Sequence, residues 1–417
     1  MLINQIRTKY KNFSTSYGKT KAIYYLLRKV LYHSFLDVYA FFYRRLGSIN
    51  DNTIVFQSKP DYSDNSRALS DYLVKSGYLD KYKIFWVVND VDYCQRMFSE
   101  SKVHFLKLTN RFGEYKLYSL RVIMSAKMLL GTHGTIFPPC KSLKGQKHIL
   151  LWHGCSFKKK TEDSILSKKD FDYALVAGPL FVSTKSEYWN SDEKYILPLG
   201  YPRYDWLRQQ ISKAEQFSAK IKGNADKIIV WMPTFRDHVK GRYGSYDGEV
   251  RFPLIQEEAE WISLDETCQL LNIKLAIKLH MFQKNYNIDF DKLKNIQLIS
   301  NTEFDKAGIS MYNFLAITDG LISDYSSVAV DYMIVDKPIA FILDDFDMYR
   351  EKRGFVFDDP RIYMPGHHVY HIGDLMKYLE DVSKCNDIYA NDRHKLKDTL
   401  VHDSTNYCEE ISTAIGL

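Results

Sequence analysis

The sequence predicts an α/β protein made of two doubly wound, Rossmann-type domains in tandem, preceded by a basic and aromatic N-terminal segment. The chain has 417 residues, which is enough for two or three domains at roughly 150 residues each. After the first fifty residues, short β-branched or aromatic runs alternate with stretches of helical length. That alternation is typical of βαβ units and of a parallel sheet covered on both faces.

The N-terminal segment, residues 1–50, differs in charge from the rest of the chain. It carries nine Lys or Arg and one acid, Asp37, a net of +8, whereas the remainder has 48 basic and 50 acidic residues, a net of −2. A nucleic-acid binder would spread positive charge over its folded domains, so this polarity argues against that class. Eleven of these residues are Tyr or Phe, which suit a bilayer interface. We expect an in-plane amphipathic membrane helix; the alternative is a helix packed on the body of the protein.

The composition indicates in which cellular compartment the protein works. The six cysteines form no CxxC pair, no signal peptide is evident, and no uncharged apolar run approaches the ~20 residues of a membrane span. The sequence therefore predicts a peripheral protein on the cytoplasmic face of the cell membrane.

The first predicted domain covers residues 51–208, with helices at 64–76 and 112–126 between its strands. A polar linker is expected at 209–226. The second predicted domain covers 227–417 and includes the polar C-terminal helices beyond about 381, which could pack on either domain. The predicted strands are 53–58, 83–88, 103–108, 128–131, 148–152, 173–177 and 195–199 in the first domain, and 227–232, 274–279, 296–300, 320–323 and 338–343 in the second.

Two histidines fall at the carboxyl ends of predicted strands, where doubly wound folds bind ligands across a cleft. His153 follows one apolar run directly and precedes Gly154, which permits close approach of a substrate. His280 ends a strand of the second domain. Each alone is more often a structural histidine, but one per domain at corresponding edges favours a shared site.

Candidate phosphate contacts follow the same logic. Ser326 and Ser327 stand at a strand-turn-helix junction, where hydroxyls and free N–H groups bind anions; an ordinary N-cap is the alternative. Thr234 and Arg236 follow another strand, and the guanidinium suits bidentate phosphate contact. Arg203 ends the last strand of the first domain, although a lone arginine there is usually a surface residue.

Other chemistries find little support. There is neither a GxxxxGK[ST] nor a GxGxxG motif, so nucleotide hydrolysis and dinucleotide redox are not predicted. The cluster Asp344, Asp345 and Asp347 is interpreted as a solvated loop, and His367-His368 as surface. Cys155 is a weak candidate for a thiol nucleophile. No metal or other cofactor is expected.

The motifs together resemble the CDP-glycerol glycerophosphotransferase family, whose members build teichoic acids and related capsule polymers. The resemblance covers about residues 53–366. Its motifs, in order, are Tyr62-Ser63-Asp64-Asn65-Ser66-Arg67-Ala68-Leu69, Trp152-His153-Gly154, Gly200-Tyr201-Pro202-Arg203, Pro233-Thr234-Phe235-Arg236-Asp237, Lys278-Leu279-His280, Ser323-Asp324-Tyr325-Ser326-Ser327 with Asp331-Tyr332, Asp336-Lys337-Pro338, and Arg353-Gly354-Phe355.

The resemblance implies a GT-B-like fold and transfer of glycerol phosphate, or ribitol phosphate, from a CDP-activated donor to a hydroxyl of a membrane-linked acceptor, with release of CMP. It also implies that His153 and His280 are catalytic. The implied donor-binding residues are Gly154, Cys155, Ser156, Phe157, Arg203, Thr234, Phe235, Arg236, Lys278, Leu279, Ser326, Ser327 and Asp331. Departures from the family pattern at Cys155-Ser156, Ser66 and Met281 bear on the geometry around the acceptor.

The mechanistic hypothesis makes His153 the general base for the acceptor hydroxyl. His280, Arg236, Ser326 and Ser327 would stabilise charge on the diphosphate. Two alternatives stay open: a GT-B glycosyltransferase that uses a nucleotide sugar, and a non-catalytic protein that binds membrane and anionic polymer. Expected partners are the membrane surface and a lipid-linked or growing polymer acceptor, with no nucleic acid.

Overall fold

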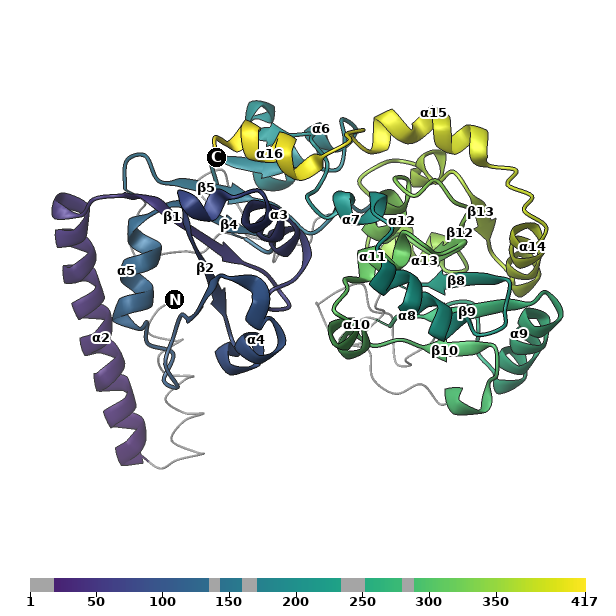
Figure 1. Ribbon diagram of the computed structural model, residues 1–417, viewed down its shortest axis with the longest axis horizontal. Coiled ribbons are helices and arrows are strands. Elements are labelled where there is room, and N and C mark those ends of the chain that lie inside the picture. The colour runs from purple at the N-terminus through teal and green to yellow at the C-terminus, as the bar shows by residue number, and fades with distance from the viewer. Residues whose placement is uncertain (1–18, 135–142, 160–170, 234–251, 280–288) are drawn as a thin grey trace.

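The chain folds into two α/β lobes with a long helix along the outside of the first (Figure 1). The computed structural model describes residues 19–134, 143–159, 171–233, 252–279 and 289–417. The predicted α/β class with parallel sheets is confirmed.

The first lobe is built on a seven-stranded parallel sheet of order β3-β2-β1-β4-β5-β6-β7. This is the order of a doubly wound fold, with its switch point between β1 and β4. Its elements are β1 Asn50–Gln57, α3 Asp64–Lys75, β2 Lys83–Val88, α4 Val91–Met97, β3 His104–Lys107, α5 Leu117–Ser125, β4 Ala126–Gly131, β5 Lys147–Leu150, β6 Tyr173–Leu175, α6 Phe181–Trp189, β7 Ile196–Leu197 and α7 Tyr204–Arg208.

The second lobe repeats the arrangement in a six-stranded parallel sheet of order β10-β9-β8-β11-β12-β13. Its switch point lies between β8 and β11. Its elements are α8 Ser212–Lys222, β8 Lys227–Trp231, α9 Glu258–Leu270, β9 Ile273–Ile277, β10 Ile296–Leu298, α10 Asn301–Ala307, α11 Met311–Leu315, β11 Gly320–Ser323, α12 Ser327–Tyr332, β12 Ile339–Ile342, α13 Phe346–Lys352, β13 His367–Val369, α14 Ile372–Ser383 and α15 Ala390–Leu400.

Every predicted strand overlaps an observed one, but the edge strand β13 was not predicted from the sequence. His367 and His368 begin this strand and pair with β12, so their interpretation as surface residues is wrong. His367 lies 3.6 Å from Asp381, and His368 bonds the carbonyl of Met364 at 3.0 Å. A three-residue strand that opens with two histidines carries no hydrophobic run by which a sequence could reveal it.

The stretch at 209–226, for which the sequence predicts a polar linker, contains helix α8. Its buried residues Ala214, Ser218 and Ile221 recur at helical spacing and face β8 and β9. The exposed positions are mostly charged or polar, which masks this narrow apolar stripe in the sequence.

The last helix, α16 Tyr407–Ile415, returns to the first lobe (Figure 1). It packs against α3 and α7, and the N–H groups of Tyr407 and Cys408 donate to Asp205 at 2.8 and 2.9 Å. The predicted second domain, 227–417, is therefore too long at its C-terminal end, because α16 belongs to the first lobe.

The long N-terminal helix, α2 Lys19–Leu46, docks on α5. Leu36 and Ala40 are buried against Leu120 and Met124, and Arg28 donates to both carboxylate oxygens of Glu114 at 2.6 Å. Packing on the body, the alternative interpretation of this segment, therefore accounts for one face of the helix. Within the described ranges, no helix has both the length and the apolarity needed to cross a membrane.

Candidate active site

His153 lies just beyond the carboxyl end of β5, as predicted, in a turn shaped by its neighbours. Trp152 has a left-handed backbone, with φ of 55°, and Gly154 follows with φ of 133°. The side chain of Asn65 donates to the carbonyls of Leu151 and Trp152 at 3.3 and 2.9 Å. A non-glycine residue in this conformation costs free energy and persists only where its surroundings hold it, so the turn is a built feature of the site.

The imidazole of His153 is held in one tautomer. Its Nδ1 lies 3.1 Å from the carbonyl oxygen of Thr132, and because a carbonyl only accepts, Nδ1 carries the proton. The lone pair therefore resides on Nε2. Burial, with a further contribution from His133, holds the pKa of His153 well below its usual value. The ring is thus neutral at physiological pH and available to accept a proton at Nε2.

Gly154 is the point where the two lobes come closest to the candidate base. A Cβ at this position would lie 2.3 Å from Ser327 Oγ and 3.1 Å from Nη2 of Arg203. Only glycine allows this approach, which brings the residue after His153 against the start of α12. Ser326 precedes that helix at the N-cap position, yet its side chain makes no capping hydrogen bond. The interpretation of Ser326 as an ordinary N-cap therefore lacks its defining contact.

Changing Gly154 to alanine should destabilise the protein by about 1–2 kcal/mol from backbone strain and a further ~1–3 kcal/mol from crowding against Ser327. Urea denaturation measures the loss. Gly77→Ala is the matched control, because Gly77 also has positive φ but has open space around it. The double variant Gly154→Ala with Ser327→Gly should recover the crowding part. Equal losses for Gly154→Ala and Gly77→Ala would contradict the close approach.

Arg203, which the resemblance implies as a donor contact, joins the lobes in this structure. It is 1% exposed and pairs with Asp64 of the first lobe and Asp331 of the second, each at 2.6 Å. Its Nη1 also donates to the carbonyl of His153 at 3.1 Å. The guanidinium lies over the rings of Tyr201 and Tyr312.

Asp331 is fully buried and also makes several hydrogen bonds within the protein. Besides Arg203, it accepts hydrogen bonds from the hydroxyls of Tyr204 at 2.8 Å and Tyr312 at 3.3 Å. Burial raises the pKa of Asp331, and the contacts with Arg203 and Tyr204 act against that shift. Arg203 and Asp331 therefore pair with each other and with further groups of the protein, although the buried Nε of Arg203 has no hydrogen-bond partner. Their role as donor contacts stays a prediction from the sequence.

A second contact between the lobes follows His153 in the chain. The carbonyl of Phe157 accepts from the N–H of Val356 at 2.9 Å, and the N–H of Lys159 donates to the carbonyl of Gly354 at 3.1 Å. Two of the sequence motifs, the segment after Trp152-His153-Gly154 and Arg353-Gly354-Phe355, thus pair through their backbones. The motifs were separate signals in the sequence and form one structural unit.

The remaining predicted residues are partly accounted for. Cys155 is buried, and burial raises the pKa of its thiol, so it remains protonated next to the hydroxyl of Tyr201 at 3.1 Å. Ser156 and Leu279 are half-buried. Lys278 is buried at the end of β9, where burial lowers its pKa, and its Nζ donates to the carbonyl of Leu279 at 3.2 Å. Thr234, Phe235, Arg236 and His280 lie outside the described residues.

Three polar residues of this site were not predicted from the sequence. Asp64 and Asn65, whose motif was noted without a role, bind Arg203 and hold the turn before His153. His133 stacks on His153 with ring centroids 4.2 Å apart. Its position after the predicted strand 128–131 is the signal that would have found it, since β4 borders the switch point of the first sheet.

Metal binding finds no support in the described ranges, where no three His, Cys, Asp or Glu side chains gather at a common point. In the acidic cluster, Asp344 accepts from the N–H of Leu254 at 2.8 Å and Asp345 from the hydroxyl of Tyr325 at 2.9 Å.

Comparison with known proteins agrees with this architecture. The teichoic acid ribitol-phosphate primase of Bacillus spizizenii is 30% identical over half of this chain, and the ribitol-phosphate polymerase TarL of Staphylococcus aureus is 24% identical over 85% of it. The chain spans only 54% and 60% of the length of these two relatives. The teichoic acid glycerol-phosphate transferase of S. aureus is 25% identical, with 88% of this chain and 92% of that protein covered.

Among solved structures, the wall teichoic acid polymerase TagF superposes with a TM-score of 0.70 at 20% identity, over 95% of this chain and 96% of that one. That likeness establishes the shared GT-B-like fold. Residues 38–413 match the family described as CDP-glycerol:poly(glycerophosphate) glycerophosphotransferase. With nine-tenths of its length inside that match, the chain belongs to the CDP-glycerol:poly(glycerophosphate) glycerophosphotransferase family.

Proposed function

We propose that this protein transfers an alditol phosphate, with glycerol phosphate favoured, from a CDP-activated donor to a hydroxyl of a membrane-linked acceptor in teichoic acid or capsule-type polymer synthesis. Membership of the family supports the reaction class. The observation that carries it is His153, which is neutral, fixed in one tautomer by Thr132, and followed by Gly154, which lies against Ser327 of the second lobe.

In the proposed reaction, the acceptor hydroxyl attacks the β-phosphorus of the CDP-alditol. Nε2 of His153 takes the hydroxyl proton as the new P–O bond forms, and the bond from that phosphorus to the bridging oxygen breaks. CMP leaves with the bridging oxygen, and His153 later returns its proton to solvent. A hydroxyl is a weak nucleophile, so a positioned base supplies typically 10²–10⁴-fold in rate.

Charge on the diphosphate calls for donors fixed in place. Ser327 fits this role because it lies across the interface from Gly154, and Ser326 precedes it at the N-cap of α12 without a capping hydrogen bond. The roles assigned to His280 and Arg236 remain predictions from the sequence, and no metal or cofactor is included in the proposal.

Mass spectrometry of the products made from CDP-glycerol, CDP-ribitol and UDP-sugars on a synthetic lipid-linked acceptor tests the function. Transfer of a glycerol- or ribitol-phosphate unit with CMP release is expected, and the product masses also report chain length. Transfer of a sugar with UDP release would favour the nucleotide-sugar glycosyltransferase instead. No transfer and no binding of any of these donors would favour the non-catalytic alternative.

The proposal also places the protein on the cytoplasmic face of the membrane through α2. Helix α2 carries ten large apolar side chains that are 46–82% exposed. They are Ile23, Tyr24, Leu27, Val30, Leu31, Phe35, Val38, Phe41, Phe42 and Leu46. So many exposed apolar side chains on one helix are unusual for a soluble domain and suit the boundary between headgroups and acyl chains.

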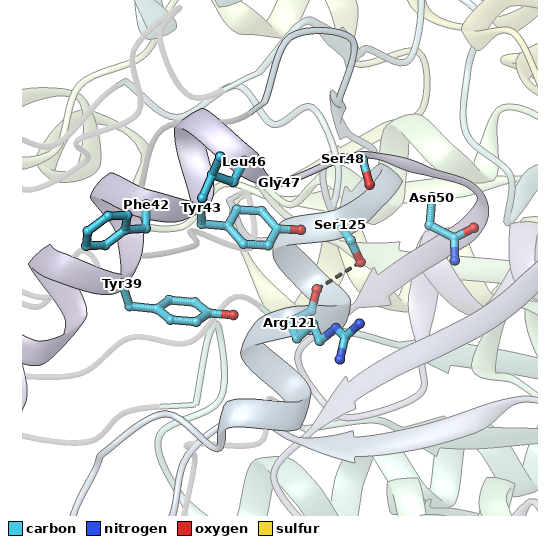
Figure 2. A pocket seen from close by; sticks show the side chains of 9 residues that line it. All are labelled: Tyr39, Phe42, Tyr43, Leu46, Gly47, Ser48, Asn50, Arg121 and Ser125. Atoms are coloured by element: carbon cyan, nitrogen blue, oxygen red, sulfur yellow. Dashed lines mark hydrogen bonds between the residues drawn. The ribbon is translucent and has the colours of Figure 1, made fainter.

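A pocket at the C-terminal end of α2 has the mixed character expected at such a boundary. It has a volume of about 600 Å³ and lies between α2 and α5. Figure 2 shows Tyr39, Phe42 and Tyr43 on one side and Arg121 with Ser125 on the other. Aromatic rings and arginine are the side chains that gather at membrane–water interfaces, which supports the orientation of this end of α2 toward lipid.

Replacing Leu31 by glutamate should weaken binding to vesicles that contain anionic lipid. Leu31 is 71% exposed, so the change removes about 1.5–3 kcal/mol of apolar burial in lipid and adds repulsion of about 1 kcal/mol. Together these predict a fall in partition on the order of a hundredfold, measured by vesicle flotation. Leu270→Glu is the matched control, because Leu270 is 85% exposed on the second lobe. Equal flotation of all three proteins would exclude α2 as the membrane contact.

A further inference from the structure

His133 is a second imidazole at the candidate active site. It directly follows β4 and the buried residue Thr132. Its ring lies parallel to that of His153, with centroids 4.2 Å apart and an interplanar angle of 6°. The indole of Trp152 also lies near the imidazole of His153, with ring centroids 4.0 Å apart and an interplanar angle of 38°. The ring of His153 is thus in close contact with two other rings.

We propose that His133 is a positioning residue for the transfer reaction: its ring fixes the orientation of the His153 imidazole, and its charge opposes protonation of that imidazole. The inference rests on the proposed function and deepens it, because it assigns a role to a residue that does not touch the reacting atoms.

Contacts with Thr132 and His133 fix the orientation of the His153 ring. The χ2 torsion of histidine is broad, so an imidazole points a chosen nitrogen at a substrate only when contacts hold the ring. Thr132 anchors both rings, because its carbonyl accepts from Nδ1 of His153 at 3.1 Å and its hydroxyl pairs with Nδ1 of His133 at 2.9 Å. With Nδ1 anchored and the ring stacked, Nε2 keeps one direction.

The charge of one histidine also affects the protonation of the other. Two imidazolium rings 4.2 Å apart repel, so the pair titrates together and accepts its first proton at only one ring. Two observations favour His133 as that ring. His133 is the more exposed of the two side chains, and Asp64 acts to raise the pKa of His133 against the lowering by burial. A first proton on His133 leaves His153 neutral.

Apart from Asp64, the charged groups around the pair lower the pKa of one or both histidines. Burial lowers the pKa of both histidines. Lys59 and Arg203 further lower that of His133, and Lys185 and Arg203 further lower that of His153. Within the described part of the chain, Asp64 is thus the acid that favours protonation, and it does so at His133.

Two substitutions separate the two roles. His133→Phe keeps a stacking ring and removes the charge, whereas His133→Ala removes both. We expect His133→Ala to lower kcat by about tenfold with KM for the CDP-alditol unchanged, because misorientation of a base costs rate rather than donor binding. His133→Phe should keep near wild-type kcat at neutral pH. In both variants the acid limb of the pH–rate profile should move to higher pH, since His153 then takes the first proton.

His104→Phe is the matched control, because His104 lies in β3 at the edge of the same sheet and its ring contacts that of Phe85, with centroids 5.1 Å apart. It should leave both kcat and the acid limb unchanged. Wild-type kcat in His133→Ala, together with an unmoved acid limb in both variants, would overturn the proposal. A loss of kcat without any shift of the limb would overturn its electrostatic half.

An NMR titration of isotope-labelled histidine rings in the full chain measures the coupling between protonation of His133 and His153, and it needs no CDP-alditol. The apparent pKa of His153 should rise in His133→Phe. Should neither CDP-glycerol nor CDP-ribitol be a substrate, the proposed function fails, whereas an unchanged titration of His153 would overturn the coupling itself.

Discussion

Replacing His153 by alanine should lower kcat for alditol-phosphate transfer by about 10²–10⁴-fold, the contribution typical of a positioned general base. The affinity for the CDP-alditol should change little, because Nε2 is assigned to the acceptor hydroxyl rather than to the diphosphate. CMP release under saturating donor measures turnover, and isothermal titration with donor alone measures binding.

Cys155→Ala is the matched control for this variant. Cys155 lies two residues away and its buried thiol has a raised pKa, so its loss should leave turnover near that of the wild type. If Cys155→Ala were inactive and His153→Ala active, the thiol rather than the imidazole would be the reacting group. Near wild-type turnover in His153→Ala would by itself refute the base assignment.

The same environment predicts the pH dependence of the rate. Burial first, and then His133, hold the pKa of His153 well below that of a free histidine. A base acts only when unprotonated, so kcat should stay level as the pH falls through the ordinary histidine range and should decline only at more acidic pH. A decline centred near the ordinary histidine pKa would mean that burial and His133 do not lower the pKa of His153.

Replacing Arg203 by methionine should lower the free energy of unfolding by about 3–5 kcal/mol, because Asp331 would stay buried without its cation. Arg203 and Asp331 are each 1% exposed or less and lie 2.6 Å apart. Since domains are stable by only about 5–15 kcal/mol, this is a large share. Urea denaturation measures it, and adding Asp331→Leu to Arg203→Met should restore part of the loss.

An exposed ion pair supplies the comparison. Lys384 and Glu380 lie 3.4 Å apart with both side chains more than half exposed, and Lys384→Met should cost at most about 1 kcal/mol. If Arg203→Met had an equally small effect on unfolding but abolished binding of the CDP-alditol, Arg203 would be the donor contact that the family resemblance implies, and its pairing with Asp331 would be secondary.

Strands were the part of the fold most readily predicted from the sequence. Parallel strands are buried on both faces, so segments such as β2 and β8 stand out as apolar runs between polar helical stretches. The edge strand β13 and the helix α8 did not stand out. Their apolar content is small, and part of their stability comes from elements that do not adjoin them in the chain, β12 for β13 and β9 for α8.

Residue types at strand ends likewise located the centre of the site. His153, Gly154 and Ser327 were predicted from their positions after or before strands, and the structure brings them together across the lobes. The partners of these residues were not predictable, because Asp64, Arg203 and Asp331 are distant in sequence and meet only when both lobes are folded. His133 was predictable in principle from its place after β4.

The sequence by itself thus determined the α/β class, the two sheets, the family and the place of His153 at the end of β5, because buried strands and the polar residues at their ends are local features of a chain. Only the tertiary structure decided that Arg203 joins the lobes, that His133 stacks on His153, and that α2 packs on α5 with one face while exposing the other. Each of these depends on which distant side chains become neighbours. That outcome depends on packing between lobes and helices, for which no local pattern of residues is sufficient.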